Sequence, residues 1–138
     1  MSYYFASVEH IETLKEEIAQ YKLKTPPGFD GTGMQTLRRC YNGIGPDAWS
    51  NRFRQFTTKI LRAFEPEALI HDWEYTFMPK TYKAFTAANF RFLVNGILYS
   101  YKAWPKSAFL RQCGRCVVLA LLCQLFGWRG YREAVNVK

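Results

Sequence analysis

Residues 65 to 79 read Glu-Pro-Glu-Ala-Leu-Ile-His-Asp-Trp-Glu-Tyr-Thr-Phe-Met-Pro, a segment that begins and ends with a proline signal. Pro66 suits the first turn of a helix, where its missing N–H leaves no hydrogen bond unmade. Met78-Pro79 ends the same helix, because a residue that precedes proline is disfavoured in the α conformation. The segment therefore predicts a helix from Pro66 onward, with the sequence His-Asp-x-x-Tyr at residues 71–75 on its surface.

Helical spacing of apolar residues, interrupted by breakers, continues on both sides of this segment. Ser7 can cap the first helix, and a linker rich in glycine and proline spans residues 24–33. No strand pattern and no internal repeat is visible. We therefore expect an all-α protein of four or five helices, with residues 66–101 forming a core helix pair. The segments that fit helices are 7–22, 48–64, 66–77, 81–101 and 107–126.

Length and charge restrict the class of protein. The 138 residues suit one domain over residues 1–138, and an aromatic content of 17% excludes a disordered chain. Nineteen Lys and Arg against 11 Asp and Glu make a basic protein of net charge +8, which favours an anionic partner such as a phospholipid surface. The basic residues are scattered and no recognised nucleic-acid-binding motif is present, so nucleic acid is the least favoured partner.

Neither targeting nor cysteine chemistry is indicated by the sequence. The N-terminal residues lack the charged and apolar regions of a signal peptide, and the longest apolar run, Cys116 to Cys123, has eight residues. A membrane span needs about 20, so we expect no transmembrane segment and a cytoplasmic location. Cys113 and Cys116 are spaced as C-x-x-C, but zinc needs four ligands and no second pair is present. Buried or half-buried thiols are the simpler interpretation.

A glycine-bearing loop is expected at residues 40–47, before the His-Asp helix. It contains Tyr41-Asn-Gly43-Ile-Gly45-Pro. Glycines at alternate positions let the backbone turn so that successive carbonyls point inward, and such oxygens suit a cation of calcium's size. Taken alone, a Gly-x-Gly loop is more often a simple turn.

The His-Asp-x-x-Tyr sequence places its three polar residues on two sides of a helix. Adjacent helical residues point about 100° apart, so His71 and Asp72 face different partners. Asp72 can turn toward the glycine loop, while His71 faces a neighbouring helix and a substrate. Tyr75 lies one turn after His71 on the same side. The structural alternative is a partly buried histidine next to a capping aspartate.

Together and in this order, the two motifs resemble the phospholipase A2 superfamily, in particular its short viral and bacterial-type branch. The resemblance covers about residues 40 to 95, and Leu125-Phe-Gly-Trp128 is similar to an ending found in phage and bacterial members. It implies a small helical domain with two antiparallel core helices, a calcium loop and flanking helices. The implied activity is hydrolysis of the sn-2 ester of glycerophospholipids.

The resemblance also implies a role for each motif residue. His71 would take a proton from the attacking water, with Tyr75 in support, and the amide of Gly43 would stabilise the developing oxyanion. The cofactor implied is Ca²⁺. Its ligands would be one carboxylate and three backbone carbonyls, those of Asp72, Tyr41, Gly43 and Gly45.

The chain departs from the family at the partner of the catalytic histidine. Members carry an aspartate on the following helix, and the matching position here is Asn89. An amide oxygen can fix the tautomer of His71, but it stabilises an imidazolium less well than a carboxylate does. The cysteines that staple secreted members are also missing, so packing by Leu69 and Ile70 must hold the helix. These departures favour, as the alternative, a catalytically weakened phospholipase A2-like phage or prophage protein, structural or partner-binding, which could be virion-associated.

Overall fold

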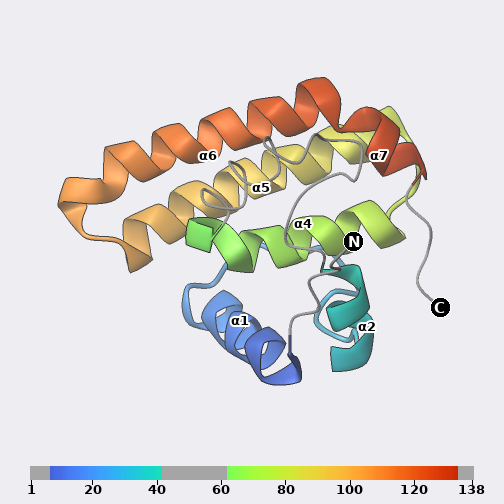
Figure 1. Cartoon of the computed structure of the whole chain (residues 1–138), viewed down its shortest axis with the longest axis horizontal. Coiled ribbons are helices and arrows are strands. Elements are labelled where there is room, and N and C mark those ends of the chain that lie inside the picture. Colours follow the sequence, from blue (N-terminus) through green and yellow to red (C-terminus); the bar gives the residue numbers. More distant parts are fainter. Residues whose placement is uncertain (1–6, 42–61, 134–138) are drawn as a thin grey trace.

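The computed structural model describes residues 7–41 and 62–133. Within these ranges the chain forms six α-helices, one short 3-10 helix and no strand (Figure 1), which confirms the all-α expectation. The phospholipase-like version of that fold remains a prediction. The elements are α1 (Val8–Gln20), α2 (Met34–Cys40), η1 (Arg62–Phe64), α4 (Glu65–Phe77), α5 (Tyr82–Ala103), α6 (Lys106–Phe126) and α7 (Trp128–Glu133).

The helix boundaries follow the local signals in the sequence. The Ser7 hydroxyl accepts a hydrogen bond from the backbone N–H of His10 at 3.1 Å and caps α1. Pro66 lies in the first turn of α4, and Thr81 caps α5 through the backbone N–H of Ala84. α6 stops at Gly127. Capping and breaking are local chemistry, which is why these ends were predictable within a residue or two.

Two short helices, α2 and α7, were not predicted. α2 has seven residues and begins after Gly33 without a side-chain cap, so local propensity does not indicate it. It is held by burial of Leu37 and Cys40, and α7 by burial of Tyr131. Cys40 therefore ends a helix instead of opening a loop as expected. The helix predicted over 48–64 lies outside the described residues, except for η1.

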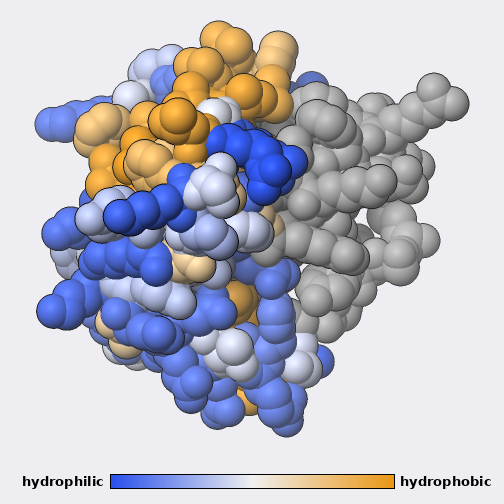
Figure 2. Space-filling view, turned by 90° about the vertical axis from the view of Figure 1, so that its left-hand side faces the viewer, coloured by the Kyte–Doolittle hydropathy of each residue, from blue (hydrophilic) through white to orange (hydrophobic). Residues whose placement is uncertain are grey.

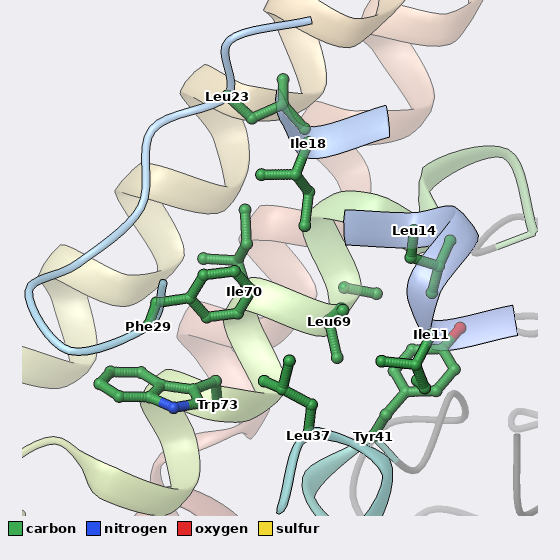
Figure 3. Packing of buried hydrophobic residues seen from close by; sticks show 11 residues of the cluster. Ile11, Leu14, Ile18, Leu23, Phe29, Leu37, Tyr41, Leu69, Ile70 and Trp73 are labelled. Atoms are coloured by element: carbon green, nitrogen blue, oxygen red, sulfur yellow. The ribbon is translucent and has the colours of Figure 1, made fainter. Parts of the chain in front are cut away.

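Helices α4, α5 and α6 follow one another in antiparallel order, and α5 packs against both of the others (Figure 1). α1 and α2 pack against α4. The main hydrophobic cluster lies where these three helices meet (Figure 3). It consists of Ile11, Leu14, Ile18, Leu23, Phe29, Leu37, Tyr41, Ala68, Leu69, Ile70 and Trp73. A second cluster, formed by Phe64, Phe92, Cys116, Leu119 and Ala120, joins α5 to α6.

α4 is buried on two sides, which makes it the central helix. Leu69, Ile70 and Trp73 face the main cluster, as expected of the residues that must hold this helix without disulfides. Its other side carries polar residues, His71 among them, that are also buried. A buried polar group is stable only when it is hydrogen-bonded, so this second side needs partners on α5.

α6 is the one helix in residues 7–41 and 62–133 that is long and apolar enough, by length and composition, to cross a membrane. The sequence predicted no transmembrane segment because it contains no uninterrupted apolar run of sufficient length. In α6 the polar residues Gln112 and Arg115 interrupt such a run, although the average composition of the helix is apolar. Core helices of soluble proteins pass the same test. The accessibility of each side of α6 is therefore more informative than its composition.

Candidate active site

The side chain of His71 on α4 meets that of Asn89 on α5. His71 Nε2 lies 2.8 Å from Asn89 Oδ1, and the two residues are only 8% and 3% exposed. A carbonyl oxygen only accepts, so in this arrangement Nε2 carries the ring proton. The unshared electron pair of a neutral His71 is therefore on Nδ1, the atom free to act as a base.

The amide of Asn89 is held at both ends. The Tyr75 hydroxyl donates to Asn89 Oδ1 at 2.9 Å, and Asn89 Nδ2 donates to Gln124 Oε1 at 2.8 Å. Gln124 Nε2 in turn donates to the hydroxyls of Tyr82 and Thr86, both at 3.1 Å. Gln124 occupies the donor end of the Asn89 amide, so the acceptor end faces His71.

Gln124 was not predicted as a site residue. A signal for it does exist in the sequence, because it is the single polar residue in Val-Val-Leu-Ala-Leu-Leu-Cys-Gln-Leu-Phe, residues 117–126. A polar side chain within an apolar helix usually has a buried hydrogen-bond partner. Which partner it finds depends on the packing of α6 against α5, and the local sequence carries no information on that packing.

The surroundings of His71 disfavour its charged form. Its ring lies between those of Tyr75 and Phe92, at centroid distances of 4.2 and 5.2 Å. Burial lowers the pKa of His71 to about 4, although the hydrogen bond to Asn89 acts in the opposite direction. The imidazole is therefore neutral at pH 7 and available as a base, but an imidazolium formed here has no adjacent negative charge from Asn89.

Tyr75 is held by Gly127, at the end of α6, and by Tyr131 of α7. Burial raises the pKa of its hydroxyl, so it remains a proton donor to Asn89. The Tyr131 ring packs edge-on against it at 4.9 Å. A Cβ at Gly127 would lie 3.0 Å from the Tyr75 hydroxyl and 2.4 Å from the Cys123 carbonyl oxygen. Gly127, within the Leu-Phe-Gly-Trp ending noted in the sequence, thus lies against this tyrosine at a place where only glycine fits.

Asp72 lies on the side of α4 next to the end of α2. Burial, and to a smaller extent the negative charge of Asp72, raise the pKa of the Cys40 thiol to about 11, while a hydrogen bond with the Thr76 side chain lowers it. Asp72 is half-buried, and its charge also acts on Cys123. Asp72 is therefore within electrostatic range of Cys40, the residue that precedes Tyr41, and of Cys123 on α6.

Tyr41 is buried where the predicted loop begins. Its hydroxyl donates to Glu65 Oε1 at 3.1 Å, and its ring belongs to the main cluster. Gly43 and Gly45 lie outside the described residues. The structure thus brings together His71, Asn89 and Tyr75, and it places Asp72 near the start of the loop. Convergence of the glycine carbonyls on Asp72 remains a prediction.

The donors near Asp72 fit a calcium ion better than a transition metal. No group of three or more His, Cys, Asp or Glu side chains able to hold a metal occurs in the described ranges. A cation at Asp72 would therefore take most of its ligands from backbone carbonyls, which are the hard oxygen donors that Ca²⁺ prefers. Cys40 and Cys123, the cysteines on which the charge of Asp72 acts, are free, and burial raises the pKa of both thiols, so neither is a thiolate at neutral pH.

In comparisons with protein families, characterised proteins and solved structures, the chain matches none. The likeness to phospholipase A2 therefore depends on the two motifs and on the geometry around His71.

Proposed function

We propose that the chain is a calcium-dependent, phospholipase A2-like hydrolase that acts on the sn-2 ester of glycerophospholipids. The observation that supports this most directly is the 2.8 Å contact between His71 Nε2 and Asn89 Oδ1, with Tyr75 bound to the same oxygen. A buried histidine whose second nitrogen is fixed by a neighbouring acceptor has the geometry of an oriented general base.

In this proposal His71 Nδ1 removes the proton of a water that attacks the ester carbonyl. Asn89 keeps the proton on Nε2, so the basic lone pair stays on Nδ1. Tyr75 and Gln124 hold the Asn89 amide in the required orientation. Because Asn89 carries no charge, the imidazolium formed in the transition state is stabilised less than it would be by an aspartate, and the rate is reduced.

Calcium would be held by Asp72 and the backbone carbonyls of Tyr41, Gly43 and Gly45. When bound it supplies a Lewis acid for the ester carbonyl and a counter-charge for the phosphate. The backbone N–H of Gly43 would donate to the developing oxyanion. The electrostatic effect of Asp72 on Cys40, the residue before Tyr41, supports this arrangement.

A second candidate is a catalytically weakened protein of the same type that serves as a phage or prophage structural or partner-binding protein. The neutral Asn89 and the pKa of about 4 at His71 favour it, because both disfavour a charged intermediate. The two candidates differ in one measurable property: the weakened protein binds calcium without turnover.

The test is calcium-dependent release of fatty acid from vesicles of phosphatidylcholine and phosphatidylglycerol. We expect release that stops when calcium is chelated, is abolished in His71→Gln and is strongly reduced in Asp72→Asn. The matched control is His10→Gln, since His10 is the chain's other histidine and pairs with Glu65 at 3.3 Å. The lysophospholipid formed should retain its sn-1 chain.

The same assay separates the two candidates. Calcium binding by calorimetry, with no fatty acid released, supports the weakened partner-binding protein and contradicts the hydrolase. Absence of both calcium binding and release contradicts both. Release that persists in His71→Gln contradicts the assignment of the base.

A further inference from the structure

The exposed hydrophobic residues of this protein are concentrated on one pair of helices. In residues 7–41 and 62–133, every large hydrophobic residue that is exposed belongs to α5 or α6. Figure 2 shows hydrophobic residues gathered in the upper part of the molecule, at the height of α6 in Figure 1, and mainly hydrophilic residues below them. The exposed residues are Tyr82, Phe90, Ile97, Tyr101, Leu110, Val117, Val118, Leu121, Leu125 and Phe126.

α6 is apolar on two opposite sides. At 100° per residue, Leu110, Val117, Leu121 and Leu125 fall within about 80° of its circumference. Its buried residues, such as Cys116 and Leu119, point the other way, into the second cluster. Leu110 is 82% exposed and Leu125 is 70% exposed. The outer stripe is therefore not part of the core, and such a concentration of exposed apolar surface usually marks a binding face.

The charge of the same hairpin indicates what kind of surface it binds. Residues 82–126 contain no Asp or Glu and six basic residues: Lys83, Arg91, Lys102, Lys106, Arg111 and Arg115. All of these except Arg91, which pairs with Glu74, are exposed. A second copy docked through this face would bring like charges together. An anionic phospholipid surface complements both the apolar residues and the charge.

The dimensions favour a helix that lies along the bilayer over one that crosses it. The apolar part of the stripe, residues 117–126, would extend about 15 Å at 1.5 Å per residue, against about 30 Å of hydrocarbon. Arg115 and Arg111 lie two and six residues before it, toward the start of α6. The opposite side of α6 is packed against α5 in the second cluster.

We propose that the outer face of the α5–α6 hairpin docks onto an anionic phospholipid bilayer, with α6 lying parallel to the membrane plane. Leucines of the stripe enter the interface, while Arg111 and Arg115 contact lipid phosphates. This surface does not include His71 or Asp72, so the proposal stands independently of any hydrolytic activity.

Vesicle flotation in the presence of a chelator tests this proposal. The full-length His71→Gln protein is used so that lipid remains intact, with vesicles of phosphatidylcholine alone or mixed with phosphatidylglycerol. We expect binding to the anionic vesicles that falls by roughly tenfold or more when the exposed stripe becomes polar in Leu110→Ser/Leu121→Ser/Leu125→Ser. Arg111→Gln/Arg115→Gln should weaken binding to anionic vesicles by roughly tenfold and leave binding to neutral vesicles unchanged.

The matched control removes the same charge elsewhere. In Lys15→Gln/Lys22→Gln, one lysine lies on α1 and the other just after it, away from the α5–α6 face. This variant should bind anionic vesicles as well as the parent protein does. All substituted side chains are at the surface or half-buried. Circular dichroism and thermal melting verify that each variant is folded before binding is compared.

Three outcomes would overturn the proposal. The first is equal vesicle binding by the triple serine variant and the parent. The second is a dimer in light scattering that dissociates in the triple variant while no vesicle binding is seen, which would assign the face to a second copy. The third is protein that resists extraction by alkaline carbonate, which would indicate a membrane-spanning helix.

The failure of this proposal can be distinguished from the failure of the proposed function. Vesicle binding without fatty acid release would contradict the hydrolase alone, and release from dispersed lipid without vesicle binding would contradict this surface alone.

Discussion

Asn89 orients His71 with a dipole, where an aspartate would also supply a charge. The 2.8 Å contact fixes the tautomer, while burial lowers the pKa of the ring to about 4. These two effects separate the functions that a carboxylate combines, orientation and charge stabilisation. At this position the first is retained and the second is absent.

Asn89→Asp should restore the missing charge. We expect the pKa of His71 to rise by about 1–3 units, because an adjacent carboxylate favours the imidazolium. The acid limb of the rate profile, expected near pH 4 in the wild type, should move up with it, and the rate at pH 7 should increase by about tenfold or more. Titration of the imidazole by NMR measures the shift.

The chain has two histidines, and the His10→Gln variant identifies which imidazole signals belong to His71. The Asn89→Asp substitution is tolerable because Gln124 can turn its amide over, with Tyr82 and Thr86 then donating to it instead of accepting. An unchanged His71 pKa would show that residue 89 does not face the ring in solution.

Gln124→Met should release the Asn89 amide. Without a partner for its donor end, Asn89 no longer favours one orientation, and the fraction of His71 protonated at Nε2 should fall. Nitrogen chemical shifts of the ring report this tautomer directly. In an Asn89→Asp background the same substitution should have little effect on the tautomer, because both carboxylate oxygens accept.

The matched control is Gln112→Met, which makes the same change at a buried glutamine of the same helix. It should leave the His71 tautomer as it is. A tautomer that is insensitive to Gln124→Met would remove Gln124 from the positioning network.

At the scale of helices, α5 and α6 pack tightly against each other at Gly96. A Cβ at this residue would lie 2.0 Å from Cys116 Sγ and 3.1 Å from Cys116 Cβ. Cys116 is itself buried, with Sγ 3.8 Å from the carbonyl oxygens of Phe92 and Leu93. The Cys116 side chain is fully buried, so the contact depends on the absence of a side chain at residue 96.

Gly96→Ala should therefore destabilise the protein by about 1–3 kcal/mol despite the better helix propensity of alanine, because overpacking outweighs a gain of about 1 kcal/mol. Urea denaturation measures the free energy of unfolding. Adding Cys116→Ala should recover part of the loss by removing the sulfur. If Gly96→Ala alone proved as stable as the wild type, the two helices would not be in contact at this residue.

The helices also show which parts of the fold were predictable. The ends of α4 and α5 follow Pro66, Pro79 and Thr81, which act locally and can be identified without a structure. α2 and α7 could not be predicted, since each is short and is stabilised by a few buried residues such as Leu37 and Tyr131. Isolated helices of that length are unstable in water, so only tertiary contacts select them.

For the molecule as a whole, α4 carries a buried acid, Glu67, whose charge would act on residues of α1, α5 and α6. Glu67 is fully buried, and neither carboxylate oxygen has a hydrogen-bond partner within the described residues. It acts electrostatically on Tyr99 of α5 and Cys116 of α6, and Glu17 of α1 acts on it. Burial raises its pKa well above the ordinary 4.5, so the folded protein holds this proton more tightly than the unfolded chain does.

The stability of the fold should therefore depend on pH through Glu67. Its contribution is fully present below the unfolded pKa near 4.5 and is lost as pH rises through the raised folded pKa. Glu67→Gln cannot ionise, so it should raise the free energy of unfolding at pH 8 by about 1–3 kcal/mol and change it little at pH 5. Urea denaturation at the two pH values measures both.

The control is Glu16→Gln, which replaces an exposed acid on α1. It should leave the free energy of unfolding unchanged at both pH values. An equal effect of Glu67→Gln at pH 5 and pH 8 would mean that ionisation of Glu67 is not what limits stability at high pH.

The local sequence determined the helical class, the main helix ends and the order of the two motifs, while Asn89 was expected as the partner of His71 only from the resemblance to phospholipase A2. Periodicity, caps and breakers act over a few residues, so they can be identified before the chain folds. Only the tertiary structure decided that Gln124 holds the Asn89 amide, that His71 is buried enough to lose its proton near pH 4, and that one side of α6 remains exposed. Each of these depends on which faces of distant helices meet, because burial and hydrogen-bond partners are properties of the packed molecule and not of the segment.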